Sequence, residues 1–352
     1  MKILVFMKNW LGDVLFQLPA IQTIRENFPD AKIIALAPQR CREILKSVPF
    51  LDGVCTFDER KSERSLFSKL KFVGWLRQEK FDQVFLFHRS FTRALLCRLG
   101  GIPKRIGFET VKRKGMLTAS VPLPKEPIHQ VDYFLVLLKW AGLRVKFGRE
   151  YQFYYSAEDD TEALRLMEAA CLKEKSFAAF HIGANWKPKK WPAEYFLGLA
   201  KLLSEYFSCP VVITGGPEEE RAAQQMVEQT KKGELISFCG KTSLGVLGAL
   251  FQKAAFVVSS DSGPLHIASG VGTPVVALFG PTSPPLTGPR GTGKKIVIPF
   301  IPEGCQTPWF GKESEFPREG WMEKITPQQV FETIARENLW KNNTEKISSS
   351  SR

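Results

Sequence analysis

Short apolar segments alternate along the chain with longer amphipathic ones. In the first half, apolar runs predict strands at 2–6, 32–36, 83–87 and 106–108, and helical spacing predicts helices at 14–27, 40–47, 66–78, 91–99 and 130–141. The second half repeats this alternation, with strands at 177–182, 211–214, 235–238, 256–259 and 275–279 and helices at 159–171, 193–206, 218–230, 244–252, 264–269 and 327–337. Strands that alternate with helices are typical of parallel sheets. We therefore predict an α/β protein of two doubly wound domains.

The boundary between the two domains is predicted from a change of pattern. Aromatic residues cluster at Tyr151 and at 153–155, without helical spacing, and a new helical segment follows. We expect an N-terminal domain at 1–150, a second domain at 151–326 and a last helix at 327–340. The polar segment 341–352 has the composition of a disordered tail.

The composition narrows the class of partner. The chain of 352 residues has 49 Lys and Arg against 36 Asp and Glu, a net charge of +13. Nucleic acid, an anionic membrane or a phosphorylated substrate fits this charge, as does a solvated basic surface without a specific partner. Zinc-finger and RRM signatures are absent, which disfavours nucleic acid.

Two further features bear on the location of the protein. The apolar stretch at the N-terminus is interrupted by Lys8, Asn9 and Asp13, so it is too short for a signal peptide, and no apolar run approaches the ~20 residues of a membrane helix. The seven cysteines are scattered, without a CxxC pair. We therefore expect a cytoplasmic protein without a disulfide framework or a metal site.

The first stretch that carries chemistry is NWLGD, directly after the first predicted strand. Gly12 allows close approach of the backbone, and Asp13 is predicted to start the next helix. As an acid at a helix start, Asp13 could act only as a cap or a first-turn residue. The functional alternative is a carboxylate in a ligand cleft that acts as a general base.

Three more stretches follow strands of the second half. HIGA, with the small residues Gly183 and Ala184, precedes a lysine-rich turn that could neutralise a diphosphate or simply be solvated. TGGPEEE places acids such as Glu218 in a helix's first turn, where the dipole favours them or where one could bind a ribose. GPTSP at 280–284 predicts another loop on the same sheet edge.

SSDSGPLH at 259–266 is the strongest of these signals. Pro264 fits the first position of a helix and Gly263 its cap, so exposed N–H groups would form an anion site beside Asp261. His266 lies inside this helix and is either packed or functional.

Taken together, these stretches resemble glycosyltransferase family 9, the bacterial heptosyltransferases of lipopolysaccharide core assembly. NWLGD followed by Pro19 is most similar to the heptosyltransferase II branch, and SFTRAL at 90–95, GIP at 101–103, RIG at 105–107, His129, KKWP at 189–192, DSGPLH and GPT also match. The resemblance covers nearly the whole chain. It implies a GT-B fold of two Rossmann-like domains facing a cleft, with a last helix that packs back on the first domain.

The resemblance also implies roles for individual residues. Asp13 corresponds to the catalytic base and Lys189 to the phosphate-binding lysine, and further donor-site residues would be Gly183, Ala184, Glu218, Asp261, Ser262, Gly263 and His266. The acceptor would meet Asn9, Trp10, Gly12, Arg93, Lys112 and Arg113. The family's late cysteine pattern is incomplete here, since only Cys305 remains.

The implied reaction is an inverting, metal-independent transfer of L-glycero-D-manno-heptose from ADP-heptose to a phosphorylated Kdo-lipid A acceptor. The basic residues within 61–80 and 105–114 would then meet this acceptor and the anionic inner face of the inner membrane. We expect a monomer with no cofactor and no nucleic-acid partner. Heptosyltransferase I, another family 9 transferase and a non-catalytic nucleotide-sugar-binding protein remain alternatives.

Overall fold

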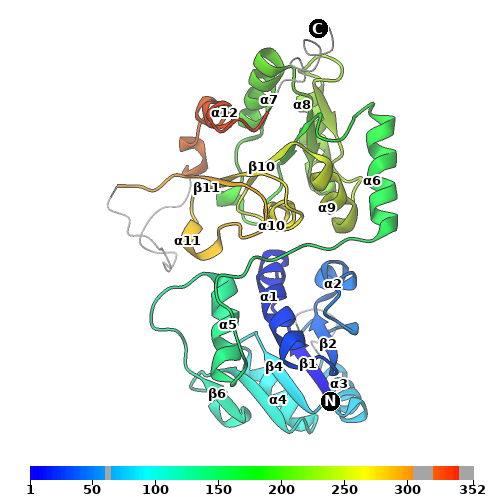
Figure 1. Ribbon diagram of the computed structural model, residues 1–352, viewed down its shortest axis with the longest axis vertical. Coiled ribbons are helices and arrows are strands. Elements are labelled where there is room, and N and C mark those ends of the chain that lie inside the picture. The colour runs from blue at the N-terminus through cyan, green and yellow to red at the C-terminus, as the bar shows by residue number, and fades with distance from the viewer. Residues whose placement is uncertain (60–64, 304–319, 341–352) are drawn as a thin grey trace, which may run out of the picture. The chain divides into compact units, whose positions relative to one another are not determined.

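The computed structural model describes residues 1–59, 65–303 and 320–340. The chain divides into two compact units, Met1–Tyr154 and a second that starts at Tyr155, so the division lies four residues beyond the expected junction after residue 150. Figure 1 shows a sheet flanked by helices in each unit. The predicted tail and Cys305 lie outside the described residues.

The first unit is built on a six-stranded parallel sheet with the order β3-β2-β1-β4-β5-β6. Its strands are almost continuously apolar because helices cover both faces. In β1, for example, the four residues after Lys2 are all buried. The strands are β1 (Lys2–Phe6), β2 (Lys32–Ala37), β3 (Gly53–Thr56), β4 (Gln83–Leu86), β5 (Lys104–Phe108) and β6 (Ala119–Val121).

Five helices cover this sheet in two layers. Helix α1 packs against α2 and α5 on one face, and α3 packs against α4 on the other. The bounds are α1 (Leu11–Asn27), α2 (Gln39–Lys46), α3 (Leu66–Glu79), α4 (Phe91–Leu99) and α5 (Gln130–Trp140), with a 3₁₀ turn, η1 (Lys114–Met116), before β6. Gly142 follows α5 with a φ of +85°, the left-handed conformation in which glycine often ends a helix.

The second unit repeats the same topology, with the order β12-β11-β10-β7-β8-β9 and every pairing parallel. Both units therefore have the doubly wound order 3-2-1-4-5-6. The strands are β7 (Ala178–His181), β8 (Val211–Thr214), β9 (Leu235–Ser237), β10 (Phe256–Ser260), β11 (Val275–Phe279) and β12 (Lys295–Pro299).

The helices of the second unit again form two layers. Helices α7, α8 and α12 pack in one layer, and α6, α9 and α10 pack in the other. The helices are α6 (Ala157–Ala169), α7 (Ala193–Phe207), α8 (Glu220–Val227), α9 (Leu244–Lys253), α10 (Gly263–Gly270), α11 (Pro284–Thr287) and α12 (Pro327–Arg336), and the 3₁₀ turns are η2 (Lys187–Lys189), η3 (Pro217–Glu219) and η4 (Met322–Lys324).

The last helix is buried within the second unit, and its expected packing on the first domain stays a prediction. Helix α12 packs against α7, and its residues Val330 and Ile334 are fully buried in the core of the second unit. The indole of Trp340 donates a hydrogen bond to the carbonyl of Phe207 at the end of α7 (3.2 Å). The apolar face of the helix is therefore buried by its own unit.

Candidate functional site

The strand order identifies where each unit can bind a ligand. In a doubly wound sheet, ligands bind at the carboxyl ends of the two strands where the order reverses. These strands are β1 and β4 in the first unit and β7 and β10 in the second. The loops after β1, β7 and β10 contain NWLGD, HIGA and DSGPLH, so the sequence motifs fall at the two expected edges.

Asp13 lies in the first turn of α1. The helix begins at Leu11 with Trp10 as its N-cap, so Asp13 does not start the helix as expected but sits two positions inside it, where the helix dipole still favours a carboxylate. Its Oδ1 is 3.1 Å from Nζ of Lys8, which also lies 3.3 Å from Oε1 of Gln130 at the start of α5. Asp13 and Lys8 are partly exposed, so a ligand can reach this pair.

Arg93 holds the loop in front of Asp13 and does not face a ligand. Only 1% of the residue is exposed. Its guanidinium donates to the carbonyl of Met7 (2.8 Å) and to the side-chain oxygen of Asn9 (2.7 Å), and it forms an ion pair with Glu59 (3.3 Å). Burial lowers the pKa of Arg93, and Glu59 opposes this shift. The guanidinium of Arg93 is thus engaged by groups of its own unit and is not exposed to a ligand.

The remaining residues expected at the acceptor separate into two groups. Trp10 is exposed and Gly12 partly exposed at the mouth of the loop, and the guanidinium of Arg40 lies 5.2 Å from the centre of the Trp10 ring. Lys112 is exposed after β5, whereas the neighbouring Arg113 is fully buried and donates to the carbonyl of His88 (3.0 Å). Burial lowers the pKa of Arg113 to about 10.

In the second unit, three of the expected residues meet. Nζ of Lys189 lies 2.7 Å from Oδ2 of Asp261, although the two residues are 72 positions apart. Nε2 of His266 lies 3.4 Å from the other carboxylate oxygen. Burial of Asp261 would by itself raise its pKa, but Lys189 and His266 outweigh this effect and hold the pKa well below its usual range. Asp261 is therefore a fixed buried anion held between two donors.

The helix that follows Asp261 offers backbone donors at the same place. Helix α10 begins at Gly263, so Ser262 is the N-cap and Pro264 the second residue, one position away from the expected arrangement. The Ser262 side chain does not cap the helix but lies 3.1 Å from the hydroxyl of Ser259. The first N–H groups of α10 thus face the loop edge, where an anion is favoured.

A buried tryptophan fixes the lysines of this site. Trp191 is fully buried, packs edge-on against Phe196 (4.7 Å) and donates to the carbonyl of Ile325 (2.8 Å). Lys189 and Lys190 directly precede this buried residue, so their backbone is held in place by the core. Lys189 then turns to Asp261, and Lys190 forms an ion pair with Glu219 (2.7 Å).

Glu219 is the buried acid of the TGGPEEE stretch, next to Glu218, which is expected at the nucleotide. Glu218 is exposed, whereas Glu219 accepts from the backbone N–H of Gly216 (3.0 Å). A Cβ on Gly183 would lie 3.2 Å from the Glu219 carboxylate and 3.0 Å from Nε2 of His181, so a larger residue there would crowd both side chains. Ala184 follows it and is partly exposed. Burial, with a smaller effect of Lys190, lowers the pKa of His181 to about 4.

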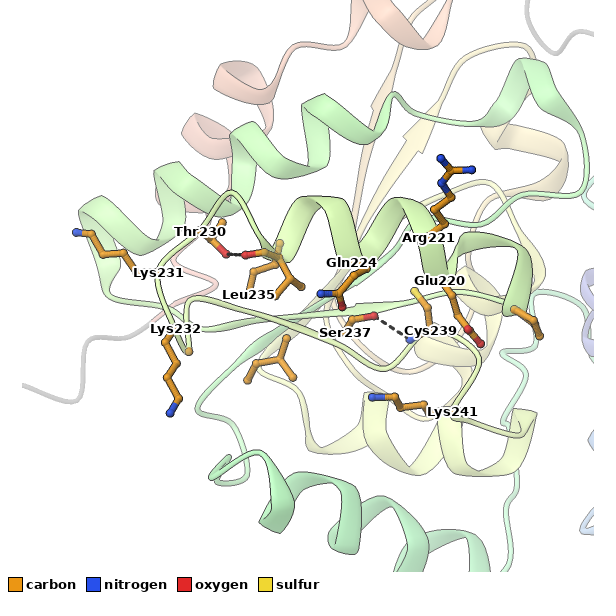
Figure 2. Close-up of a pocket in the computed structure, with 14 residues that line it drawn as sticks. Glu220, Arg221, Gln224, Thr230, Lys231, Lys232, Leu235, Ser237, Cys239 and Lys241 are labelled. Atoms are coloured by element: carbon orange, nitrogen blue, oxygen red, sulfur yellow. Dashed lines mark hydrogen bonds between the residues drawn. The ribbon is translucent and has the colours of Figure 1, made fainter.

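A surface cavity of about 830 Å³ lies outside this site, between α8 and the edge strand β9. Figure 2 shows Ser237 and Cys239 in its wall, while Lys231 and Lys232 point away from them. None of the expected site residues lines this cavity. Across 1–59, 65–303 and 320–340, no group of three His, Cys, Asp or Glu side chains is placed to hold a metal ion.

Sequence reasoning missed Lys8, Glu59 and Glu219. Lys8 could have been found, because it is the one basic residue of the loop between β1 and α1, where a partner for Asp13 would lie. Glu59 has no sequence signal, since its role depends on the packing of the β3–α3 connection beside α4. The three adjacent acids at 218–220 look alike in sequence, and only the turn geometry separates them.

Two doubly wound units in one chain have the architecture of the GT-B fold, and the match to a family profile identifies the enzyme class as a glycosyltransferase. The chain belongs to glycosyltransferase family 9 (heptosyltransferase), whose sequence profile matches residues 70–316.

Individual relatives agree with this assignment. Lipopolysaccharide heptosyltransferase 2 of Escherichia coli K12 is 27% identical, over 95% of this chain and 97% of that protein. The solved ADP-heptose lps heptosyltransferase II of E. coli is similar with a TM-score of 0.77 and 25% identity, over 96% of this chain and 98% of that one. A family 9 glycosyltransferase from Veillonella parvula has the same fold, with a TM-score of 0.84, 23% identity and 96% coverage of both chains.

Proposed function

We propose that this glycosyltransferase moves L-glycero-D-manno-heptose from ADP-heptose to the heptosyl-Kdo₂-lipid A inner core, as a heptosyltransferase II. The observation that carries the proposal is the pairing of Lys189 with Asp261 beside the start of α10, because it creates a fixed cation and free N–H groups where a diphosphate would sit. The similarity to the E. coli lipopolysaccharide heptosyltransferase 2 and to the solved ADP-heptose lps heptosyltransferase II supports ADP-heptose as donor and lipopolysaccharide as product.

The donor is assigned to the second unit. Lys189 and the N–H groups of Ser262 and Gly263 would bind the diphosphate, and Asp261 and His266 would contact the sugar. Lys190 and Glu219 lie next to the small residues Gly183 and Ala184, so this corner suits the ribose of the nucleotide. In the transition state, the fixed donors stabilise negative charge that develops on the departing diphosphate.

The acceptor and the proton transfer are assigned to the first unit. An acceptor hydroxyl oxygen attacks the anomeric carbon from the face opposite the diphosphate. A carbon–oxygen bond forms to the acceptor as the bond from the anomeric carbon to the diphosphate oxygen breaks, and the bonding electron pair leaves with ADP. Asp13 takes the hydroxyl proton, and Lys8 holds its carboxylate in place. This single displacement inverts the anomeric configuration.

The proposed reaction takes place at the inner face of the inner membrane, with the protein bound peripherally. The described helices include none that is long and apolar enough to cross a membrane. The basic charge of the chain suits a phosphorylated lipid acceptor and the anionic membrane around it.

Turnover of defined substrates tests the proposal. Purified protein with EDTA, ADP-heptose and heptosyl-Kdo₂-lipid A should release ADP and add one heptose to the acceptor, as measured by mass spectrometry. Kdo₂-lipid A without the first heptose should react much more slowly, and equal or faster reaction would instead assign heptosyltransferase I. ADP-heptose binding without transfer to any acceptor of the panel would favour a non-catalytic nucleotide-sugar-binding protein.

A further inference from the structure

Helix α3 of the first unit exposes apolar side chains over its first two turns. Leu66, Phe67 and Leu70 are 75%, 78% and 58% exposed. Farther along the helix, Phe72, Val73 and Leu76 are buried. Single exposed apolar residues are ordinary, but three on adjacent positions of one helix are typical of an interaction surface.

The spacing puts these side chains on one face. Leu66 and Leu70 are four positions apart, and Phe67 and Leu70 are three positions apart. Both spacings bring side chains together on a helix surface, so the three residues form one continuous apolar surface. Four positions beyond Leu70 is Gly74, where an added Cβ would have no atom within 4 Å. The exposed face is therefore unpartnered within the described part of the chain, and we call Leu66, Phe67 and Leu70 the α3 tip.

The charges around the α3 tip are basic. Lys71, one turn after Phe67, and Arg77, two turns after Leu70, are both exposed on the same face. The acid of this helix, Glu79, forms an ion pair with Lys2 and is thereby neutralised. A short apolar tip flanked by cations matches the chemistry of an anionic bilayer interface, where acyl chains take up the tip and phosphate groups meet the cations.

We propose that the α3 tip is a membrane-docking surface that inserts Leu66, Phe67 and Leu70 into an anionic bilayer, with Lys71 and Arg77 at the headgroups. The proposal deepens the proposed function, because a lipid acceptor must be reached at a membrane. The purpose of docking rests on that proposed function, whereas the docking surface itself is argued from the exposed residues and charges of α3. A second copy of the chain is disfavoured as the occupant, since its α3 tip would bring like charges together.

Vesicle binding tests the surface directly. Purified full-length protein is sedimented with phosphatidylcholine vesicles that either contain or lack phosphatidylglycerol, without acceptor lipid. Wild-type protein should bind the anionic vesicles, and F67E/L70E should bind at least about tenfold more weakly. Lys71→Gln should weaken binding about fivefold, and only when phosphatidylglycerol is present and the salt concentration is low.

A matched control separates docking from general surface effects. Trp140→Glu replaces another large apolar side chain of the same unit, 63% exposed at the end of α5, and should bind vesicles like wild type. F67Q/L70Q serves as a second variant without added charge, so that the result does not depend on repulsion or on the folding of one variant. Near-UV circular dichroism should be unchanged in all of them.

The outcomes distinguish the docking surface from the reaction. F67E/L70E should keep the wild-type rate with acceptor in detergent micelles and lose it with acceptor in vesicles. Wild-type binding to anionic vesicles by F67E/L70E, or failure of the wild-type protein to bind them, would overturn the docking surface even if transfer occurs. Vesicle binding without any transfer would instead contradict the proposed function. If the wild-type protein is a dimer and F67E/L70E is a monomer, the α3 tip is a self-association surface, and this result would also overturn the proposal.

Discussion

The two units share one topology but differ in how their sites are held. In the first unit, the Asp13–Lys8 pair is partly exposed at the loop between β1 and α1. Arg93 and Arg40 hold this loop by hydrogen bonds to its backbone carbonyls. In the second, Asp261 is buried, bound by Lys189 and His266, and followed directly by a helix N-terminus. The same sheet order thus supports a reachable carboxylate in one unit and a buried, paired carboxylate beside a helix N-terminus in the other.

This difference corresponds to the demands of a sugar transfer. A general base must meet a hydroxyl on a variable acceptor, so it needs access and one orienting partner. A leaving diphosphate needs donors that are fixed before the reaction, because reorganising them would cost free energy in the transition state. Substitutions in the two units should therefore change different kinetic quantities.

The largest effect is expected at Asp13. Asp13→Asn removes the proposed base but keeps the size of the side chain, and should lower kcat by about 10²–10⁴. Asp30→Asn, at an exposed position after the other end of α1, is the matched control and should leave kcat unchanged. Steady-state kinetics with saturating ADP-heptose measures both. A folded Asp13→Asn protein with full activity would refute the base assignment.

The next effect is expected at Lys189. Lys189→Met should lower kcat by about 10²–10³, because one fixed donor to the leaving group is lost. Lys187→Met removes an exposed lysine from the same 3₁₀ turn and should have little effect. Lys189→Met also removes the lysine that pairs with the buried Asp261, at a cost of about 3–5 kcal/mol in stability. Adding Asp261→Asn should restore the denaturation midpoint but not kcat, and recovery of both would mean that Lys189 is only structural.

A smaller effect separates positioning from chemistry in the first unit. Lys8→Met removes one charge-assisted hydrogen bond to Asp13 and should lower kcat about tenfold, at unchanged KM for ADP-heptose. Lys8→Arg keeps the charge and should recover most of the rate. A rise in KM for the donor with unchanged kcat would place Lys8 outside the role that we give it.

The two neighbouring acids of the second unit give a sharper comparison still. Glu219→Gln should weaken ADP binding severalfold, because it disturbs both Lys190 and the turn at Gly216. Glu218→Gln, on the exposed neighbour, should bind ADP like wild type. Isothermal titration calorimetry resolves the two, and the reverse order would restore Glu218 as the nucleotide-binding acid.

The smallest effect concerns stability against pH. His181 has a pKa lowered from 6.5 to about 4 by burial, so between these values the unfolded chain binds more protons than the folded one. The contribution of His181 to the free energy of unfolding should fall as the pH drops from 6.5 to 4, by at most roughly 3 kcal/mol, and level off below. The lowered pKa of Asp261 acts only at more acidic pH. Denaturant titrations of His181→Asn should lack this loss, and an equal loss would assign it to another group.

Much of the fold could be predicted from the sequence because parallel strands are continuous apolar runs. Helix α4 and strands β1, β8 and β11 have the predicted bounds, whereas β3, β6 and β12 were missed. These three are short or outer strands with few buried residues, so their apolar signal is weak. The last helix was predicted from its amphipathic pattern. The element against which it packs could not be predicted, because such a pattern does not identify the packing partner.

The candidate site was predicted less completely, for a physical reason. Motif residues that follow strands β1, β7 and β10 were found because the carboxyl ends of parallel strands collect ligands. Whether a charged side chain faces solvent or the protein depends on tertiary contacts, which the sequence does not show. Arg93 and Arg113 were expected to face the acceptor, but both are buried and bound to groups from other elements.

The central claim is that the first unit supplies the base and the second holds the donor. Calorimetric binding of ADP to Asp13→Asn and Lys189→Met, alongside their transfer rates, tests it most directly. We predict that Asp13→Asn binds ADP with wild-type affinity and transfers almost no sugar, whereas Lys189→Met loses both affinity and rate. Loss of ADP affinity in Asp13→Asn, with Lys189→Met binding normally, would contradict this division of roles.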